Sequence, residues 1–303
     1  MPYRTFTPEQ LTPSQRHHYL LGTVNPRPIC FASTVDKDGR PNLAPYSFFN
    51  IFSSTPPVFI FSVNTRRDGS IKDTLHNVKE VPEVVINLVN YPMARQMAIC
   101  GVEYDTGINE FEKGGFTPIP SEKVKPFRVK ESPVQFECKV LETRAMSDKP
   151  GAANLIIAEA LLIHLDESIL ADENTIDPHS IDMVGRMGNF NYCRASGESV
   201  FAIRQPPADI AIGFDNLPEH LKTSKTLSGH YLAMMAGVTK LPGSDTISGF
   251  ANQPDVQKFI TNFNKQSNDK TVLLHEEILN YLEKSEIENA WKLALWAEQS
   301  GVI

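Results

Sequence analysis

The chain has 303 residues and a formal net charge of −7, and 41% of its residues are hydrophobic. That is enough apolar material to bury a core in one large domain or two modest ones, and a charged fraction of 21% does not favour a disordered chain. The acidic balance also argues against general binding to nucleic acid, although a local basic site for a phosphate is compatible with it.

The sequence contains no apolar stretch that approaches the roughly 20 residues of a transmembrane helix. The longest candidate, residues 155–165, is interrupted by Glu159 and His164. Residues 1–15 are polar and lack the apolar core of a signal peptide. We therefore expect a soluble, cytoplasmic protein with no membrane partner.

The cysteines are far apart in the sequence and form no CxxC pair: Cys30, Cys100, Cys138 and Cys193. We interpret them as buried thiols rather than as disulfides or metal ligands. His17 and His18 form the only close histidine pair, and no cysteine or carboxylate stands at ligand spacing from them. We interpret both as exposed side chains and predict no metal site.

The first two thirds of the sequence are mostly strand-like. Apolar stretches, most of them rich in β-branched or aromatic residues, predict six strands: residues 28–35, 44–52, 58–63, 84–89, 133–145 and 154–165. Residues 36–39 have the composition of a hairpin turn, and two prolines at 56–57 force a break before the third strand. Strands at this spacing favour a barrel over a doubly wound sheet.

Three short helices are expected between these strands: residues 70–80, 93–101 and 109–113. The first follows Asp68-Gly69, and either Asp68 or Ser70 can cap it. The third ends at Gly114-Gly115.

Composition changes near residue 205. Residues 204–209 contain consecutive prolines, which exclude both a helix and a central strand, so we interpret them as a linker. Beyond them apolar residues recur at helical spacing: Leu274, Ile278 and Leu282, then Ile287, Trp291 and Leu295. Residues 285–288 match a capping box, and we expect Trp291 and Trp296 to anchor helix packing. The sequence thus predicts a β-rich domain over residues 1–205 and a small all-α region over residues 206–303.

Two neighbouring stretches combine features that suit one ligand. Residues 42–50 bring together aromatics, a proline and small polar side chains, and residues 62–74 end in a polar, cation-bearing helix start. Such a combination can hold a planar ring at one end and a phosphate at the other, with donors from Ser62, Arg66, Arg67, Lys72 and Thr74. From the residues alone, a core strand with packed aromatics and a solvated helix start remain open alternatives.

The order of motifs adds a more specific indication. Residues 25–62, then 72–78 and 84–89, resemble the flavin reductase-like family of FMN-binding split barrels, and the likeness continues through residues 132–140, 157–167 and 185–195. The resemblance implies a mainly β fold, an FMN-binding split β-barrel with short helices. Residues 206–303 then form the helical extension of a longer family member.

Carried over by position, the resemblance puts seven residues around the flavin ring and ribityl chain: Asn42, Ala44, Pro45, Tyr46, Ser47, Phe48 and Asn50. It puts four near the phosphate and ribityl chain: Ser62, Lys72, Asp73 and Thr74. It puts three at the rim of the pocket, from the same chain or a neighbouring subunit: His164, Arg186 and Tyr192. From the residues alone, a single histidine on an apolar strand such as His164 is more often a hydrogen-bonded core residue than a catalytic acid. For Arg186 and Tyr192, a purely structural role is an equally open alternative.

The resemblance implies a flavoprotein oxidoreductase of the NAD(P)H-dependent flavin reductase type. NADH or NADPH would deliver hydride to flavin N5, and the reduced flavin would pass electrons to a small-molecule acceptor or an oxygenase partner. Because the cofactor performs this chemistry, no catalytic side chain is assigned. No GxGxxG motif follows a strand, so a separate dinucleotide-binding domain is not expected.

The resemblance also implies a homodimer. Two other functions stay open at this point. One is an FMN-binding module or sensor without turnover of its own, and the other is a barrel similar to pyridoxamine-phosphate oxidase.

Overall fold

The structure is a computed structural model, and it describes residues 2–203, 211–265 and 270–303. The chain divides into two compact units, the first ending at Phe201 and the second beginning at Ala202. The linker expected at residues 204–209, and with it the predicted division after residue 205, lies outside the described residues.

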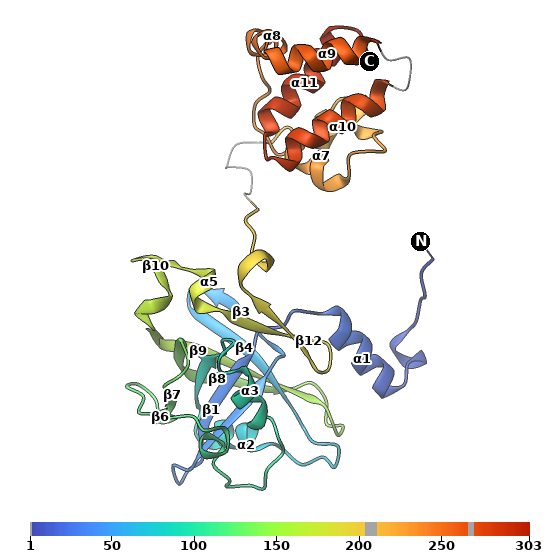
Figure 1. Cartoon of the computed structure of the whole chain (residues 1–303). Coiled ribbons are helices and arrows are strands. Elements are labelled where there is room, and N and C mark those ends of the chain that lie inside the picture. Colours follow the sequence, from blue (N-terminus) through green and yellow to red (C-terminus); the bar gives the residue numbers. More distant parts are fainter. Residues whose placement is uncertain (1, 204–210, 266–269) are drawn as a thin grey trace. The chain divides into compact units, whose positions relative to one another are not determined.

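The first unit is built on a seven-stranded sheet in which every neighbouring pair is antiparallel (Figure 1). Its strands are β1 (Cys30–Val35), β2 (Pro41–Tyr46), β3 (Phe49–Ser54), β4 (Pro57–Asn64), β5 (Glu83–Leu88), β8 (Val134–Ala145) and β9 (Ala153–Leu165). Their spatial order is β2-β1-β5-β8-β9-β4-β3. The predicted stretches at 28–35, 58–63, 84–89, 133–145 and 154–165 are therefore confirmed as strands.

The stretch at residues 44–52 is two strands rather than the single one expected. β2 ends at Tyr46 and β3 begins at Phe49, so only Ser47 and Phe48 separate the two outermost strands of the sheet. Because so short a connection holds the two edges close together at this point, the sheet must curl back on itself. This bend closes the sheet into the expected barrel.

Apolar side chains fill the barrel and cover its outer face. Inside the barrel, Phe61, Val84 and Ile156 belong to one buried cluster. A second cluster lies on the other side of β1, where Phe31 packs against Phe116 with ring centroids 5.1 Å apart. Since strand residues alternate between faces, β1 contributes to both clusters.

Short helices surround the sheet: α1 (Pro13–Thr23), α2 (Asp73–Glu80), α3 (Ala94–Ile99), α4 (Glu110–Gly114) and α5 (Pro178–Ile181). The predictions at 93–101 and 109–113 are confirmed, and Gly115 ends α4 with a left-handed φ of 68°. The helix expected at 70–80 starts three residues late. The Asp68 carboxylate accepts from the N–H and hydroxyl of Ser70 in a separate turn, so neither residue caps α2.

No helix was expected where α1 lies. Its start is nevertheless marked in the sequence by Pro13 at the first helical position and by a capping box between Thr12 and Gln15. None of its residues is buried.

Three small hairpins complete the strands of the first unit: β6 (Pro118–Ile119) with β7 (Arg128–Val129), β10 (Leu170–Asp172) with β11 (Thr175–Ile176), and β12 (Met183–Met187) with β13 (Asn191–Ala195). Four 3-10 turns are described: Pro8–Gln10, Glu167–Ile169, Gly197–Ser199 and Phe214–Asn216. Isolated bridges at Arg27–Arg186 and Asn90–Met183 hold β12 beside the residues that flank β1 and β5.

The second unit contains six described helices: α6 (Glu219–Lys222), α7 (Gly229–Ala236), α8 (Ser244–Ala251), α9 (Pro254–Lys265), α10 (Lys270–Glu283) and α11 (Ile287–Gln299). The apolar residues at helical spacing pack into its core as predicted, with Leu274, Ile278 and Leu282 buried on α10. Trp291 is buried and donates its indole N–H to the Met235 carbonyl at 3.0 Å. Trp296 packs edge-on against Phe263, so both tryptophans anchor helices as predicted.

The capping box expected at residues 285–288 is wrong. Ser285 has a left-handed φ of 61°, and its N–H bonds back to the Leu282 carbonyl at the end of α10. Glu286 is the N-cap of α11 and makes no side-chain cap. Ser285 thus belongs to the sharp turn that ends α10, and it does not act as the N-cap of α11.

All four cysteines are free thiols; three are buried, and Cys193 is half-buried. No helix in the described parts of the chain is long and apolar enough to cross a membrane.

Candidate functional site

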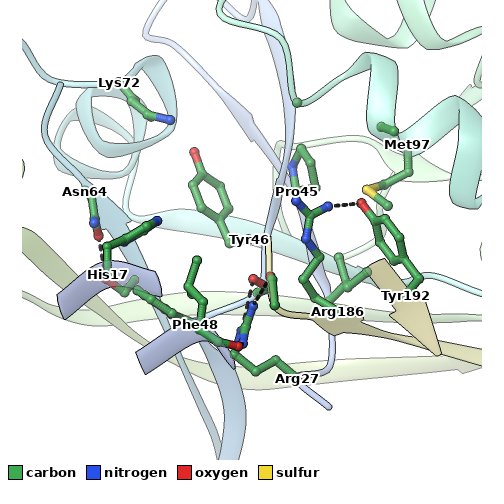
Figure 2. Close-up of a pocket in the computed structure, with 17 residues that line it drawn as sticks. His17, Arg27, Pro45, Tyr46, Phe48, Asn64, Lys72, Met97, Arg186 and Tyr192 are labelled. Atoms are coloured by element: carbon green, nitrogen blue, oxygen red, sulfur yellow. Dashed lines mark hydrogen bonds between the residues drawn. The ribbon is translucent and has the colours of Figure 1, made fainter. Parts of the chain in front are cut away.

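A cavity of about 430 Å³ opens at the bend between β2 and β3 (Figure 2). This volume lies within the roughly 300–1,000 Å³ typical of small-molecule sites. The cavity is lined by His17, Leu21, Arg27, Ile29, Pro45, Tyr46, Ser47, Phe48, Ser62, Asn64, Lys72, Met97, Ala98, Gly101, Arg186, Gly188 and Tyr192. The lining therefore comes from α1, the approach to β1, the bend, β4, the start of α2, α3 and its C-terminal end, and the β12–β13 hairpin.

A smaller cavity of about 60 Å³ adjoins the first one and shares four lining residues with it: Pro45, Tyr46, Lys72 and Gly101. Its other lining residues include four of the predicted ones: Asn42, Ala44, Asp73 and Thr74. The two cavities together run from the hairpin past the bend to the first turn of α2.

The bend supplies backbone donors to the main cavity. Ser47 and Phe48 lie outside the ladder, and their N–H groups donate to no residue that the structure describes. The Phe48 carbonyl, in contrast, accepts the Ser62 N–H at 2.9 Å. Pro45 on one side and Phe48 on the other add apolar surface. A flat ring with a polar edge can therefore lie along this bend with its acceptors toward the free N–H groups.

The start of α2 supplies a site for an anion. Lys72 is the N-cap, and because an ammonium cannot accept a hydrogen bond it leaves the N–H groups of the first turn unpaired. Its ammonium lies 3.4 Å from a carboxylate oxygen of Glu103, which is itself exposed and can swing away. The helix dipole and the lysine together favour a phosphate at this end.

A buried hydrogen-bond network fixes the wall between the ring end and the phosphate end. Tyr46 donates its hydroxyl to Thr74 at 2.9 Å, and the Asn42 amide donates to the same oxygen at 2.9 Å and to Thr34 at 3.2 Å. Asn77 also donates to Thr34, at 3.1 Å. Burial raises the pKa of Tyr46 well above its usual value, so the phenol stays protonated and can donate.

Glu110 supports the same wall from α4. It is buried and accepts the Leu43 N–H at 3.0 Å, and burial raises the pKa of its carboxyl. The Cys100 thiol donates to the Glu110 carbonyl at 3.3 Å, and burial, with the nearby Glu110 charge, raises its pKa to about 12. This cysteine is therefore an uncharged packing residue at physiological pH.

At the other end of the cavity, Arg27 holds several segments together. The residue is 6% exposed, and its guanidinium donates to the carbonyls of Leu21 and Val24 at 2.9 and 2.7 Å, and to the Gly188 carbonyl at 3.3 Å. Burial lowers the pKa of Arg27, and the charge of Arg186 adds to the effect. An arginine whose partners are neutral oxygens stays charged nonetheless.

Arg186 and Tyr192 lie opposite each other on the hairpin. The Arg186 guanidinium donates to the Tyr192 hydroxyl and to the Asn189 carbonyl, and it lies 4.7 Å from the centroid of the tyrosine ring. Figure 2 shows this pair and Arg27 at one end of the lining and Lys72 at the other.

The structure brings together twelve of the fourteen predicted residues in the two adjoining cavities. Asn50 and His164 line neither of them. Asn50 is exposed on β3, and its side chain accepts the Ile51 N–H. His164 lies 2.8 Å from the buried Glu137 carboxylate on the neighbouring strand. The placement of Asn50 near the flavin and that of His164 at the rim of a pocket, in the same chain or in a neighbouring subunit, stay predictions.

Several lining residues were not predicted: His17, Leu21, Arg27, Ile29, Asn64, Met97, Ala98, Gly101 and Gly188. Asn64 could have been found, because it follows Ser62 by two residues on a strand and therefore faces the same side. The predicted exposure of His17 is confirmed, and its place in the lining was not predicted. It lies on α1, and without that helix nothing in the sequence connects it to the bend.

Comparisons with known proteins agree with this geometry. Residues 22–177 match the flavin reductase like domain. An uncharacterized protein of Aquifex aeolicus is 41% identical over 179 residues, which span 59% of this chain and 89% of that protein.

Solved structures give the same result. Nitrilotriacetate monooxygenase component B from Bacillus cereus has a TM-score of 0.63 at 27% identity, covering 67% of this chain and all of that one. The 2-nitrobenzoate 2-nitroreductase of Pseudomonas fluorescens has a TM-score of 0.58 at 28% identity, covering 66% of this chain and 96% of that one. A split-barrel-domain protein from Shewanella frigidimarina, at 22% identity and a TM-score of 0.57, shows the same fold. With the domain match spanning more than half of its length, the chain belongs to the flavin reductase-like family, and its first unit is a split barrel of that family.

Proposed function

We propose that the protein is an FMN-binding oxidoreductase whose flavin lies in the two adjoining cavities. The observation that carries this proposal is that the same cavity is lined by the free backbone N–H groups of Ser47 and Phe48 and by the cationic helix start at Lys72. The donor set fits FMN, because its phosphate carries about −1.5 to −2 charges and the ring has a polar edge that needs donors.

Each end of the site has a distinct task. Lys72 and the first turn of α2 bind the phosphate, with Ser62 beside them. The N–H groups of Ser47 and Phe48 orient the polar edge of the ring and stabilise negative charge there. Pro45, Tyr46 and Phe48 exclude water from the ring.

When bound, FMN would supply hydride and electron transfer, so the chain itself needs no acid or base for that step. We propose NADH or NADPH as the reductant and a small oxidant or an oxygenase partner as the acceptor. Two of the similar structures, a monooxygenase component and a nitroreductase, support this class of reaction by their names.

Rapid mixing of the FMN-loaded protein with NADH or NADPH under anaerobic conditions tests the activity. We expect the visible absorbance of the oxidised flavin to bleach at a rate that saturates with one of the two nucleotides. A bound flavin that stays oxidised with both would refute reductase activity and leave an FMN-binding module or sensor. Failure to take up FMN at all would refute the cofactor assignment.

We also propose that two copies of the chain associate through the exposed C-terminal part of β9. Leu161, Ile163 and Leu165 are alternate residues of this part and are 43–50% exposed. Covering such an apolar row with a second copy would remove it from water. Light scattering should give twice the chain mass for the wild type. Ile163→Lys places a charge in the middle of the row and should give the monomer, whereas a monomeric wild type would contradict the proposal.

A further inference from the structure

The strongest unexplained feature of the cavity is a pair of arginines set directly opposite each other. Arg27 and Arg186 form an antiparallel bridge in which each N–H bonds to the carbonyl of the other, at 3.0 and 2.8 Å. Side chains in such a pair start about 4.5–5.5 Å apart, and like charges placed there repel. Both side chains nonetheless line the same cavity.

Nothing in the described part of the chain neutralises this pair. The partners of Arg27 are carbonyls and, at 3.5 Å, the Ser47 hydroxyl, while those of Arg186 are a hydroxyl and a carbonyl. No described residue that lines the main cavity is an aspartate or a glutamate. An anion bound beside the two guanidinium groups would relieve this repulsion.

The phosphate proposed at Lys72 does not serve this purpose, because Lys72 lies at the opposite end of the lining (Figure 2). One FMN carries one phosphate, so a second oxyanion group, bound at the arginine end, would belong to another molecule. This step rests on the proposed function.

We propose that Arg186 and Tyr192, with Arg27 behind them, form a second subsite that binds an oxyanion, carboxylate or phosphate, on the molecule that exchanges electrons with the flavin. Arg186 uses two of its N–H donors internally, and a guanidinium has five, so three remain for the oxygens of an anion. Tyr192 accepts from Arg186 and can donate its own proton to the same anion. Arg27 has its donors engaged by Leu21, Val24 and Gly188 and contributes its charge.

The test uses FMN-loaded wild type, Arg186→Met and Tyr192→Phe, with Lys72→Met as the matched variant at the other end. Benzoate and its neutral analogue benzamide are titrated while the flavin absorbance is followed, and pyrophosphate is titrated likewise. Reduction by NADH is compared with reduction by N-benzyl-1,4-dihydronicotinamide, which carries no phosphate.

We expect Arg186→Met to lower the affinity for at least one anionic ligand tenfold or more, and Tyr192→Phe to lower the affinity for the same ligand several-fold. Binding of benzamide and reduction by the benzyl nicotinamide should be unaffected in both variants. If only the binding of NADH and pyrophosphate is lost, the subsite recognises a diphosphate. If only the binding of benzoate is lost, it recognises a carboxylate. Tyr192→Phe keeps the ring and so covers the case in which Arg186→Met does not fold.

Unchanged binding of benzoate, pyrophosphate and NADH in the two hairpin variants would overturn the inference. So would a loss of FMN affinity in Arg186→Met as large as that in Lys72→Met, because Arg186 would then belong to the flavin itself. If the wild type takes up no FMN, the proposed function fails first and this inference with it, and that outcome is distinct from the other two.

Discussion

Lys72 has two properties that favour the same ligand. As the N-cap of α2 it leaves the first-turn N–H groups without a partner, and as a cation it attracts the anion that those groups would bind. Its only ion-pair partner in the described chain is the exposed Glu103. An exposed pair of this kind contributes little, so a phosphate can replace the carboxylate at small cost.

Replacing both polar groups at this end should weaken FMN binding. Charge-assisted hydrogen bonds contribute about 1.5–3 kcal/mol each, so Ser62→Ala with Lys72→Ala should raise the Kd for FMN at least tenfold, measured by quenching of flavin fluorescence. Lys79→Ala, in the last turn of the same helix, is the matched control and should leave the Kd unchanged. An unaltered Kd in the double variant would rule out the phosphate assignment.

Sequence patterns predicted some site residues better than others for a physical reason. Pro45 to Phe48 and Lys72 to Thr74 are contiguous segments, and a resemblance over a segment locates all of its members at once. Arg27 enters the cavity because β12 folds back beside it, 159 positions later, through the bridge to Arg186. That distance in sequence carries no periodicity, and only tertiary structure reveals the pairing.

At the level of secondary structure, the bend between β2 and β3 creates the site. The apolar run at residues 44–52 predicts one strand because its composition is uniform, yet the chain must cross from one sheet edge to the other at Ser47 and Phe48. Closure of the barrel overrides local propensity here. The same closure leaves the N–H groups of both residues unpaired.

The α4 helix behind the bend is packed too tightly for any side chain at Gly114. A Cβ there would lie 2.5 Å from the Cys100 sulfur and 2.9 Å from the Phe116 ring. Gly114→Ala should therefore destabilise the barrel by about 1–3 kcal/mol, measured by urea unfolding with circular dichroism. Gly22→Ala, on α1 with open space around it, should be neutral or stabilising. Equal stability of the two variants would contradict this packing.

In the second unit, α6 and α10 meet through two stacked histidines. The Ser224 hydroxyl already accepts the N–H groups of Thr226 and Leu227, so its proton goes to Nδ1 of His275 at 2.8 Å. His275 then carries its proton on Nε2 and donates to Nδ1 of His220 at 3.0 Å. A second proton on His220 would have to enter at that same nitrogen and would break the bond.

This arrangement makes the helical unit sensitive to acid. Burial lowers the pKa of His220, while the Glu298 charge opposes the effect. The unfolded chain therefore binds this proton more readily, so stability is complete above the unfolded pKa of about 6.5 and declines below it, by at most about 1.4 kcal/mol per pH unit.

Unfolding followed by tryptophan fluorescence at pH 7.5, 6.5 and 5.5 checks this, because both tryptophans lie on α11. His220→Gln should flatten the decline between pH 6.5 and 5.5, and His230→Gln, an exposed histidine of the same unit, should not. A decline of the same slope in all three proteins would show that other groups cause it.

Across the whole molecule, the two units have separate cores. Barrel residues form two of the buried clusters, and the third consists of residues from Leu217 onward. Among the residues that the structure describes, all those that line the two cavities of the candidate site precede Cys193. We therefore propose that residues 1–205 form a domain that binds flavin without the helical region.

Deleting residues 206–303 should leave the Kd for FMN within about twofold of the full chain, because none of the lining residues found in the described ranges is lost. Truncation after Gly188 is the matched control. It removes β13 and Tyr192, exposes the partner strand of the hairpin, and should weaken binding far more. In the full chain, urea should unfold the units at different concentrations, with tryptophan reporting the helices and released flavin the barrel. Because separate cores need not unfold together, coincident unfolding of the barrel and the helices would contradict the division into two domains. A truncated barrel that fails to fold would contradict it as well.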